Sequence, residues 1–258
     1  MLKKISVVGK GKMGKSVVDL LTEQDYKKNS KKNYKLDKIF DASNPVSKSS
    51  LINLDLVIDC SVGEAFLQNL PLYLESKVNL IVVASNWYHQ LQEVQQQVLN
   101  SGIKFLYSDN YAVGSYIYKQ ILEATFQKLT GLGFDFALQE SHHFYKKDYP
   151  SAVAKKIADL AIHNLQEKTS WSADPAIGVA NKKTFYISSL RYGTNTIEHS
   201  LNCASEAEDI KITHSVRNRK VFAQGIVSGI EFLDSQAQGF YDMASLVDWL
   251  HSTKSEVD

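Results

Sequence analysis

The stretch Ile5-Ser6-Val7-Val8-Gly9-Lys10-Gly11-Lys12-Met13-Gly14 decides the fold. A short run rich in β-branched residues leads into a G-x-G-x-x-G pattern, and apolar positions within 16–21 suit a helix packed on a sheet. Strand, glycine turn and helix in this order form the context of a dinucleotide fingerprint, because the glycines let backbone approach a pyrophosphate at the positive helix end. An ordinary glycine turn is the alternative. The residues predicted to bind the dinucleotide here are Gly9, Gly11, Lys12, Met13 and Gly14.

Further strands continue this pattern through the first hundred residues. They are predicted at 36–40, 56–59, 80–83 and 103–106, as short apolar runs typical of parallel strands covered on both faces. Helical stretches lie between them, most clearly at 90–99. The alternation predicts an α/β fold with an N-terminal Rossmann-type, doubly wound parallel sheet. A polar segment at 27–33 is predicted to be a solvated loop.

The loops at the carboxyl ends of these strands are predicted to line the cofactor crevice. The second strand ends at Asp41, where such folds place an acid that accepts hydrogen bonds from the adenine ribose. No basic residue directly follows Asp41, which favours NADH over NADPH as the cofactor. Three lysines, Lys10, Lys12 and Lys48, could still approach a 2′-phosphate, so NADPH stays open. The remaining predicted cofactor residues are Ser61, Ala84, Ser85, Ser108 and Asn110.

The pattern changes after residue 115. Helices are predicted at 117–129, 152–165 and 221–233. Strands are predicted at 134–139, 184–191, 194–203 and 209–216, the last three with clearer alternation. This indicates a smaller α+β domain with an open, mainly antiparallel sheet. We expect residues 1–109 and 218–258 to form the dinucleotide-binding domain, and residues 110–217 to form a domain for substrate binding and oligomerisation.

The run Glu140-Ser141-His142-His143-Phe144-Tyr145-Lys146-Lys147-Asp148-Tyr149-Pro150-Ser151 is the best candidate for chemistry. Nine consecutive residues of this run, 140–148, contain two histidines, two lysines and two acids. Groups that change charge near neutral pH, beside fixed cations, are what proton delivery to an anionic substrate requires. Taken alone, however, a lysine-rich run with histidines is more typical of a solvated turn.

Composition limits the compartment and the partners. The net charge of +1 argues against a broad nucleic-acid surface. Cys60 and Cys203 fit no metal-ligand spacing and suit a reduced, intracellular setting. No apolar run has the length of a membrane span, and the start of the chain lacks the features of a signal peptide. The sequence therefore predicts a cytoplasmic protein without a metal, nucleic-acid or membrane partner.

Over nearly the whole chain, the order of motifs resembles the dihydrodipicolinate reductase family of lysine biosynthesis. The amino-terminal glycine turn belongs to the resemblance, as do the segments 58–61, 82–84 and 108–114. Further along, Arg191-x-Gly193 and Glu198-His199 fit the family's carboxyl-terminal pattern. The most specific piece matches the family's Glu-x-His-His-x-x-Lys-x-Asp-Ala-Pro-Ser-Gly-Thr through Glu140, His142, His143, Lys146, Asp148, Pro150 and Ser151.

The resemblance implies a reaction and a role for each residue. A hydride from NADH or NADPH would reduce 4-hydroxy-tetrahydrodipicolinate, a cyclic imine dicarboxylate, to tetrahydrodipicolinate. By resemblance, His142 donates a proton, Lys146 pairs with a substrate carboxylate and helps deliver that proton, and His143 orients the substrate. The helix start at Ser151, Ala152 and Val153 would bind a carboxylate. The family's open sheet pairs with its copies, which implies a homotetramer.

Two departures from the family bear on the substrate and the cofactor. Ser151-Ala152-Val153 replaces Ser-Gly-Thr, and the lost threonine hydroxyl would cost about 1.5–3 kcal/mol of binding. Ser85-Asn86-Trp87 replaces Thr-Thr-Gly, unless the loop is shifted by one residue and Trp87 packs outward. Two alternatives therefore stay open: a reductase or dehydrogenase of another cyclic imine or amino-acid-like carboxylate, and a non-catalytic dinucleotide-binding homologue. His199 and His214 are predicted to support the sheet.

Overall fold

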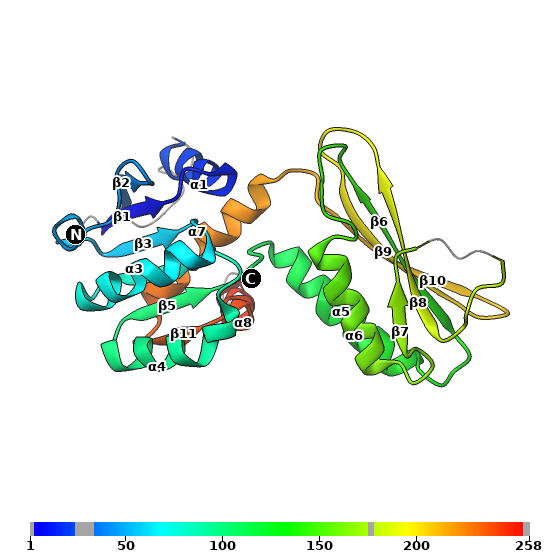
Figure 1. The fold of residues 1–258 in the computed structure, drawn as a ribbon. Helices are drawn as coiled ribbons and strands as arrows, with labels where there is room; N and C mark the ends of the chain where they lie inside the picture. The colour runs from blue at the N-terminus through cyan, green and yellow to red at the C-terminus, as the bar shows by residue number, and fades with distance from the viewer. Residues whose placement is uncertain (1–2, 24–33, 175–177, 255–258) are drawn as a thin grey trace. The chain divides into compact units, whose positions relative to one another are not determined.

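The computed structural model of the chain describes residues 3–23, 34–174 and 178–254, which form two compact units (Figure 1). The first unit runs to Val113 and resumes at Lys220, and the second comprises Gly114–Arg219. These limits lie a few residues from the predicted ones. The roles of the two units, dinucleotide binding for the first and substrate binding and oligomerisation for the second, stay predictions. The predicted solvated loop at 27–33 lies outside the described residues.

The first unit is built on a six-stranded sheet in the order β11-β5-β4-β3-β1-β2, in which every pairing is parallel. Its strands are β1 (Lys3–Val8), β2 (Tyr34–Phe40), β3 (Leu56–Asp59), β4 (Asn79–Val82), β5 (Lys104–Tyr107) and β11 (Gly239–Tyr241). The helices are α1 (Lys12–Thr22), α3 (Gly63–Glu75), α4 (Leu91–Ser101), α7 (Lys220–Ser235) and α8 (Met243–Lys254), with the short turns η1 (Lys48–Leu51) and η2 (Tyr88–Gln90). β2 lies on one side of β1, and the chain then crosses to the other side, where β3, β4 and β5 follow in order. Such sheets bind ligands at this switch point between β1 and β3.

Helices cover both faces of this sheet, which explains the continuous apolar strands. Leu80 and Val82 belong to the core cluster that includes α3 and α4. Ile81, between them, points the other way, and its Cδ1 atom lies close to Gly229 of α7. Because both faces of these strands are buried, apolar and polar residues do not alternate along them. The predicted doubly wound parallel sheet is therefore confirmed.

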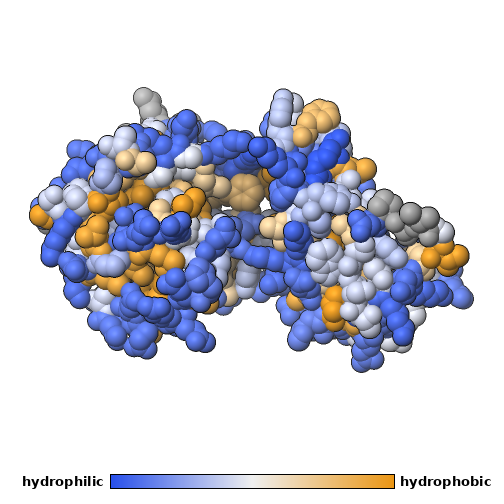
Figure 2. All heavy atoms as spheres, in the orientation of Figure 1, coloured by the Kyte–Doolittle hydropathy of each residue, from blue (hydrophilic) through white to orange (hydrophobic). Residues whose placement is uncertain are grey.

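The second unit has a five-stranded sheet in the order β10-β9-β6-β8-β7. Its strands are β6 (Asp135–His142), β7 (Ser170–Ser172), β8 (Thr184–Arg191), β9 (Ile197–Ala204) and β10 (Asp209–Ser215). Two helices, α5 (Val113–Leu129) and α6 (Ala152–Asn164), contribute Phe126 and Ile157 to the core against one face. Figure 2 shows hydrophilic residues over much of the visible surface of this unit.

The second sheet is mixed, so the prediction of a mainly antiparallel sheet is wrong in that detail. β9 runs antiparallel to β6 and β10, but β8 runs parallel to β6 and to β7. The reason is that α6 lies between β6 and β7 along the chain, and a helical crossover returns the next strand, β7, in the direction of β6. β8 then pairs parallel to both. β7, with only three residues, was not predicted.

No helix among the described residues combines the length and the apolar character that crossing a membrane requires.

Candidate active site

The glycine turn between β1 and α1 owes its shape to two of its glycines. Gly9 has a φ of 96°, and a Cβ atom there would lie 2.7 Å from the carbonyl oxygen of Cys60. A Cβ on Gly14 would lie 1.9 Å from the carbonyl oxygen of Gly9. Gly11 differs from both, because a Cβ there would meet nothing within 4 Å. The space in front of α1, which has no side-chain cap, is therefore open and fits a dinucleotide phosphate.

Asp41, at the end of β2, is already paired. Its Oδ2 atom lies 2.6 Å from Nζ of Lys10, and its Oδ1 atom accepts hydrogen bonds from the backbone of Ser43 and Asn44. Lys10 holds the pKa of Asp41 well below its ordinary value. Because Lys10 neutralises the acid predicted to bind the ribose, this pair bears directly on the choice between NADH and NADPH. Lys48 lies elsewhere and pairs with Glu75 at 3.0 Å.

The loop after β4 is anchored by Trp87. This side chain is fully buried, its Nε1 atom donates to the carbonyl of Ala84 at 2.8 Å, and its ring centroid lies 5.0 Å from that of Phe66. The alternative in which Trp87 packs outward is therefore wrong. The left-handed residue of the loop is Asn86, with a φ of 67°, and both Ser85 and Asn86 are exposed. Asn tolerates this conformation better than most residues.

Polar groups of three other predicted cofactor residues form hydrogen bonds within the turns in which they lie. The backbone N–H of Ser61 donates at 2.9 Å to Asp59, a fully buried acid. Ser108 Oγ accepts from the N–H of Asn110 at 3.0 Å, and the Asn110 side chain accepts from the N–H of Ala112 at 2.9 Å. What these loops can offer a ligand is thus mainly backbone.

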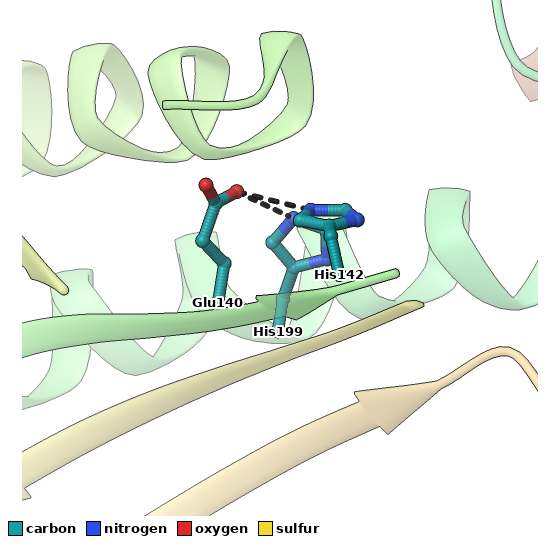
Figure 3. A group of neighbouring side chains, drawn as sticks. All are labelled: Glu140, His142 and His199. Atoms are coloured by element: carbon teal, nitrogen blue, oxygen red, sulfur yellow. Dashed lines mark hydrogen bonds and ion pairs between the residues drawn. The ribbon is translucent and has the colours of Figure 1, made fainter. Parts of the chain in front are cut away.

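In the second unit, the first part of the histidine run is strand rather than a solvated turn. Glu140 and His142 lie on β6, with exposed fractions of 0% and 4%. The Nε2 atom of His142 lies 3.1 Å from Oε2 of Glu140 (Figure 3). His199 enters from the adjacent strand β9, where it pairs with Glu140 in register, and its Nε2 atom lies 3.6 Å from the same oxygen. One buried carboxylate thus faces two histidines.

Three further contacts complete the surroundings of Glu140. Ser189 on β8 donates its hydroxyl at 2.6 Å, the N–H of Ser151 donates at 3.2 Å to each carboxylate oxygen, and Arg191 Nη2 lies 3.7 Å away. Burial by itself would raise the pKa of Glu140, but hydrogen bonds from its neighbours, that of His142 foremost, bring it well below the ordinary value. The carboxylate therefore stays ionised, and its remaining neighbours can only donate to it.

This cluster also meets the distance requirement for a metal site, although the sequence predicted none. Ligand atoms of Glu140, His142 and His199 all lie within 4.8 Å of one another. The histidine nitrogens nearest the carboxylate are, however, already within reach of hydrogen-bonding partners. We therefore interpret the cluster as a hydrogen-bonded one.

Ser151 caps α6, accepting from the N–H of Ala154 at 3.1 Å. Its hydroxyl also lies 3.1 Å from Nε2 of His199, and its N–H is bound to Glu140. Because Ser151 is buried and its groups are committed, a ligand at this helix start would meet the exposed Ala152 and the half-buried Val153 first.

Lys146 and His143 lie in the loop that follows β6. Nζ of Lys146 lies 2.7 and 2.8 Å from the two carboxylate oxygens of Asp148. Burial alone would raise the pKa of Asp148, but Lys146 and the N–H of Ala152 lower it. The N–H of His143 donates to the carbonyl of Thr196 at 2.9 Å. Lys146, which is predicted to pair with a substrate carboxylate, thus pairs with a carboxylate of its own chain.

Tyr149 does not replace the missing threonine hydroxyl in this arrangement. Its own hydroxyl donates to the carbonyl of Ala173, and its ring lies under the guanidinium of Arg191 at 6.0 Å.

Family models match both units of the chain. The family model of the dihydrodipicolinate reductase N-terminus matches residues 3–111, and that of the C-terminus matches residues 114–247. The chain belongs to the dihydrodipicolinate reductase family. As a member, it is an NAD(P)-dependent oxidoreductase.

Relatives in this family have diverged far in sequence. The 4-hydroxy-tetrahydrodipicolinate reductase of Methanococcus aeolicus is 25% identical over 260 residues, which cover 92% of this chain and 94% of the relative. That of Pseudoalteromonas atlantica is 28% identical and covers 75% of this chain and 73% of its own. Among solved structures, the dipicolinate-bound dihydrodipicolinate reductase from Paenisporosarcina sp. TG-14 has a TM-score of 0.70 at 18% identity, covering 94% of this chain and 98% of that one. This likeness extends the family's fold to the present chain.

Sequence reasoning named His142, His143, Lys146 and Ser151 but gave no role to Glu140 or to Ser189. It took His199 only as support for the sheet. A glutamate two positions before His142 was the available signal, because the strand predicted at 134–139 continues to His142 and alternate residues of a strand share a face.

Proposed function

We propose that the chain catalyses the NAD(P)H-dependent reduction of 4-hydroxy-tetrahydrodipicolinate to tetrahydrodipicolinate, a step of the diaminopimelate and lysine pathway. The observation that carries the proposal is the buried hydrogen bond between His142 and Glu140 on β6, in a chain that the family models of both the N-terminus and the C-terminus match. The solved relative that binds dipicolinate supports a small dicarboxylate as the ligand.

In this proposal a reduced nicotinamide supplies the hydride, and the chain's own residues supply the proton and hold the carboxylates. His142 is the proton donor, because an imidazolium beside a carboxylate can give up a proton near neutral pH. Lys146 exchanges Asp148 for a substrate carboxylate. The N–H groups of Ala152 and Val153 bind at the positive end of α6, and His143 orients the ring.

The cofactor is proposed to lie over the glycine turn, with its pyrophosphate at Gly11, Lys12 and Met13. The tight packing of Gly9 and Gly14 shapes the turn that would hold it. Asp41 is proposed to face the ribose; Ser61, Ala84, Ser85, Ser108 and Asn110 are proposed to line the rest through backbone groups. The preference for NADH predicted from the sequence depends on whether Lys10 leaves Asp41.

The test is NADH and NADPH oxidation with the condensation product of aspartate semialdehyde and pyruvate. Turnover by the purified protein is expected. If the protein binds NADH but does not turn over this substrate, a reductase of another cyclic imine or amino-acid-like carboxylate becomes the better hypothesis. The specific feature that favours this second function is Val153 in place of the family's threonine.

Lys146→Ala separates an enzyme from a non-catalytic dinucleotide-binding homologue. The variant is expected to lose turnover by roughly 10²–10⁴-fold, the usual contribution of a positioned proton-transfer group. NADH binding, measured by fluorescence titration, is expected to stay the same. Wild-type protein that binds NADH but shows no turnover with any cyclic imine tried would support the non-catalytic alternative.

A homotetramer, located in the cytoplasm, completes the proposal. The outer strands β10 and β7 each have one partner in the described sheet, and strand edges of this kind invite pairing with another copy. Open-face residues such as Gln139, Ser188 and Lys211 are not covered by α5 or α6. Sedimentation at micromolar concentration is expected to give a tetramer, and a monomer there would contradict it.

A further inference from the structure

We infer that Glu140 is a positioning residue, which holds His142 by Nε2 so that the proton given to the substrate leaves from Nδ1. The inference rests on the proposed function, and it assigns the role of one residue and of one particular nitrogen atom in that reaction.

The first support is the direction of the hydrogen bond. An ionised carboxylate has no proton to donate, so Nε2 of His142, 3.1 Å from Glu140 Oε2, must carry the hydrogen. In the neutral imidazole this fixes the tautomer, and Nδ1 then carries a lone pair. In the imidazolium, Nδ1–H is the proton that no neighbour holds.

The second support is the state of Nδ1 itself. It is buried, and among the described residues it has no hydrogen-bond partner. Buried polar atoms are almost always paired, and an exception at a candidate site indicates a position that a ligand or a water fills. The substrate is the natural partner for Nδ1, since Glu140 already occupies the other nitrogen.

The third support is the rigidity of the carboxylate. Glu140 is itself fixed from two other elements, by Ser189 and Arg191 on β8 and by the N–H of Ser151 at the start of α6. A group held this firmly can restrain the ring of His142, as partners one layer removed do at other catalytic sites.

The proton balance of the step is complete. The 4-hydroxyl of the substrate leaves as water with a proton from the adjacent ring carbon, so that a C–O and a C–H bond break and a π bond conjugated with the imine forms. This conjugated imine then gains a hydride at one end of the new π bond and a proton at the other, so that the π bond breaks and two new bonds to hydrogen form. The nicotinamide is oxidised as it loses the hydride. His142 passes from imidazolium to neutral imidazole with Nε2–H still donated to Glu140, and it regains the Nδ1 proton from solvent.

Several charged groups face this pair, and they bear on its pH dependence. His199 on β9 shares the carboxylate, but burial lowers its pKa, and its interaction with the accepting carboxylate of Glu140 only partly offsets this. Burial therefore favours the neutral form of His199, and the carboxylate of Glu140 stays ionised beside His142. Arg191 lies 3.7 Å from Oε1 of Glu140, the oxygen that His142 does not contact. The charge of Lys146, in the loop after β6, also lowers the pKa of His199.

The kinetic test is Glu140→Gln, with Glu206→Gln as a matched control at an exposed site of the same unit. We expect kcat of Glu140→Gln to fall roughly 10–100-fold. The high-pH limb of the kcat profile, where the donor loses its proton, is expected to move to lower pH, because the charge that favours the imidazolium is gone. Glu140→Asp is expected to return the limb toward that of the wild type. A Glu140→Gln enzyme with the wild-type limb and kcat would overturn the proposal.

A spectroscopic test does not depend on turnover. In wild-type protein with ¹⁵N-labelled histidine, the His142 resonances are those lost in His142→Gln. Above the titration of His142, the expected species has Nε2–H and an unprotonated Nδ1. The opposite tautomer would overturn the proposal. If this tautomer is found but the wild type does not reduce the proposed substrate, the proposed function fails and the positioning role stands.

Discussion

The glycine turn and the Glu140 cluster are built in opposite ways. The turn depends on missing side chains within one continuous segment, where a Cβ on Gly14 would lie 1.9 Å from a backbone oxygen. The cluster depends on side chains from three strands and the start of α6, among them Glu140, Ser189 and His199. Backbone packing makes the first site, and a hydrogen-bond network makes the second.

This difference determines how each site should respond to mutation. In the turn, adding one carbon atom disturbs the fold itself, because the obstacle is backbone that cannot rotate away. In the cluster, a substitution removes a hydrogen-bonding partner of a buried group, which changes the chemistry of the site more than its shape.

Gly14→Ala should have the largest effect on stability. The new Cβ would conflict with the carbonyl of Gly9, and we expect the free energy of unfolding to fall by about 3 kcal/mol. Gly11→Ala is the matched control, since a Cβ there meets nothing within 4 Å. It should keep the stability and weaken NADH binding by occupying the space left for the pyrophosphate. Urea denaturation and NADH titration of both variants measure these effects; equal stability losses would contradict the distinction.

The same contrast explains what the sequence could predict. The glycine turn and the parallel sheet are local patterns, and both could be inferred from the order of residues. The orientation of Trp87 could not, because its partner Phe66 lies on another element. Nor could the role of Glu140, since Ser189 is 49 residues away and only the register of β6 with β8 brings it into contact.

Val153→Thr restores the hydroxyl that the family places at the start of α6. If this site binds a substrate carboxylate, the added hydrogen bond should be worth about 1.5–3 kcal/mol, which lowers KM on the order of tenfold to a hundredfold. Val153→Ala is the control, because it changes the side chain without adding a donor. An unchanged KM in Val153→Thr would mean that another group of this chain already serves the carboxylate.

Asp148→Asn tests whether Lys146 is restrained by its own chain. The carboxylate of Asp148 holds Nζ of Lys146 at 2.7 and 2.8 Å, and it is half exposed, so the pair is screened by solvent. Freeing the lysine should lower KM for the dicarboxylate by up to about fivefold, in keeping with the modest energies of such pairs. A rise in KM would instead mean that Asp148 positions Lys146 for binding.

Lys10→Met should have the smallest effect, and it concerns which cofactor is used. Lys10 lies 2.6 Å from Asp41, so its loss leaves that carboxylate free to accept hydrogen bonds from ribose hydroxyls. The same loss removes the cation that would offset a 2′-phosphate. We therefore expect the ratio of kcat/KM for NADH over NADPH to rise about two- to fivefold. Lys48→Met is the control, because Lys48 pairs with Glu75 and leaves Asp41 untouched. A ratio that shifts toward NADPH in Lys10→Met would show that the lysine serves the NADH ribose rather than the phosphate.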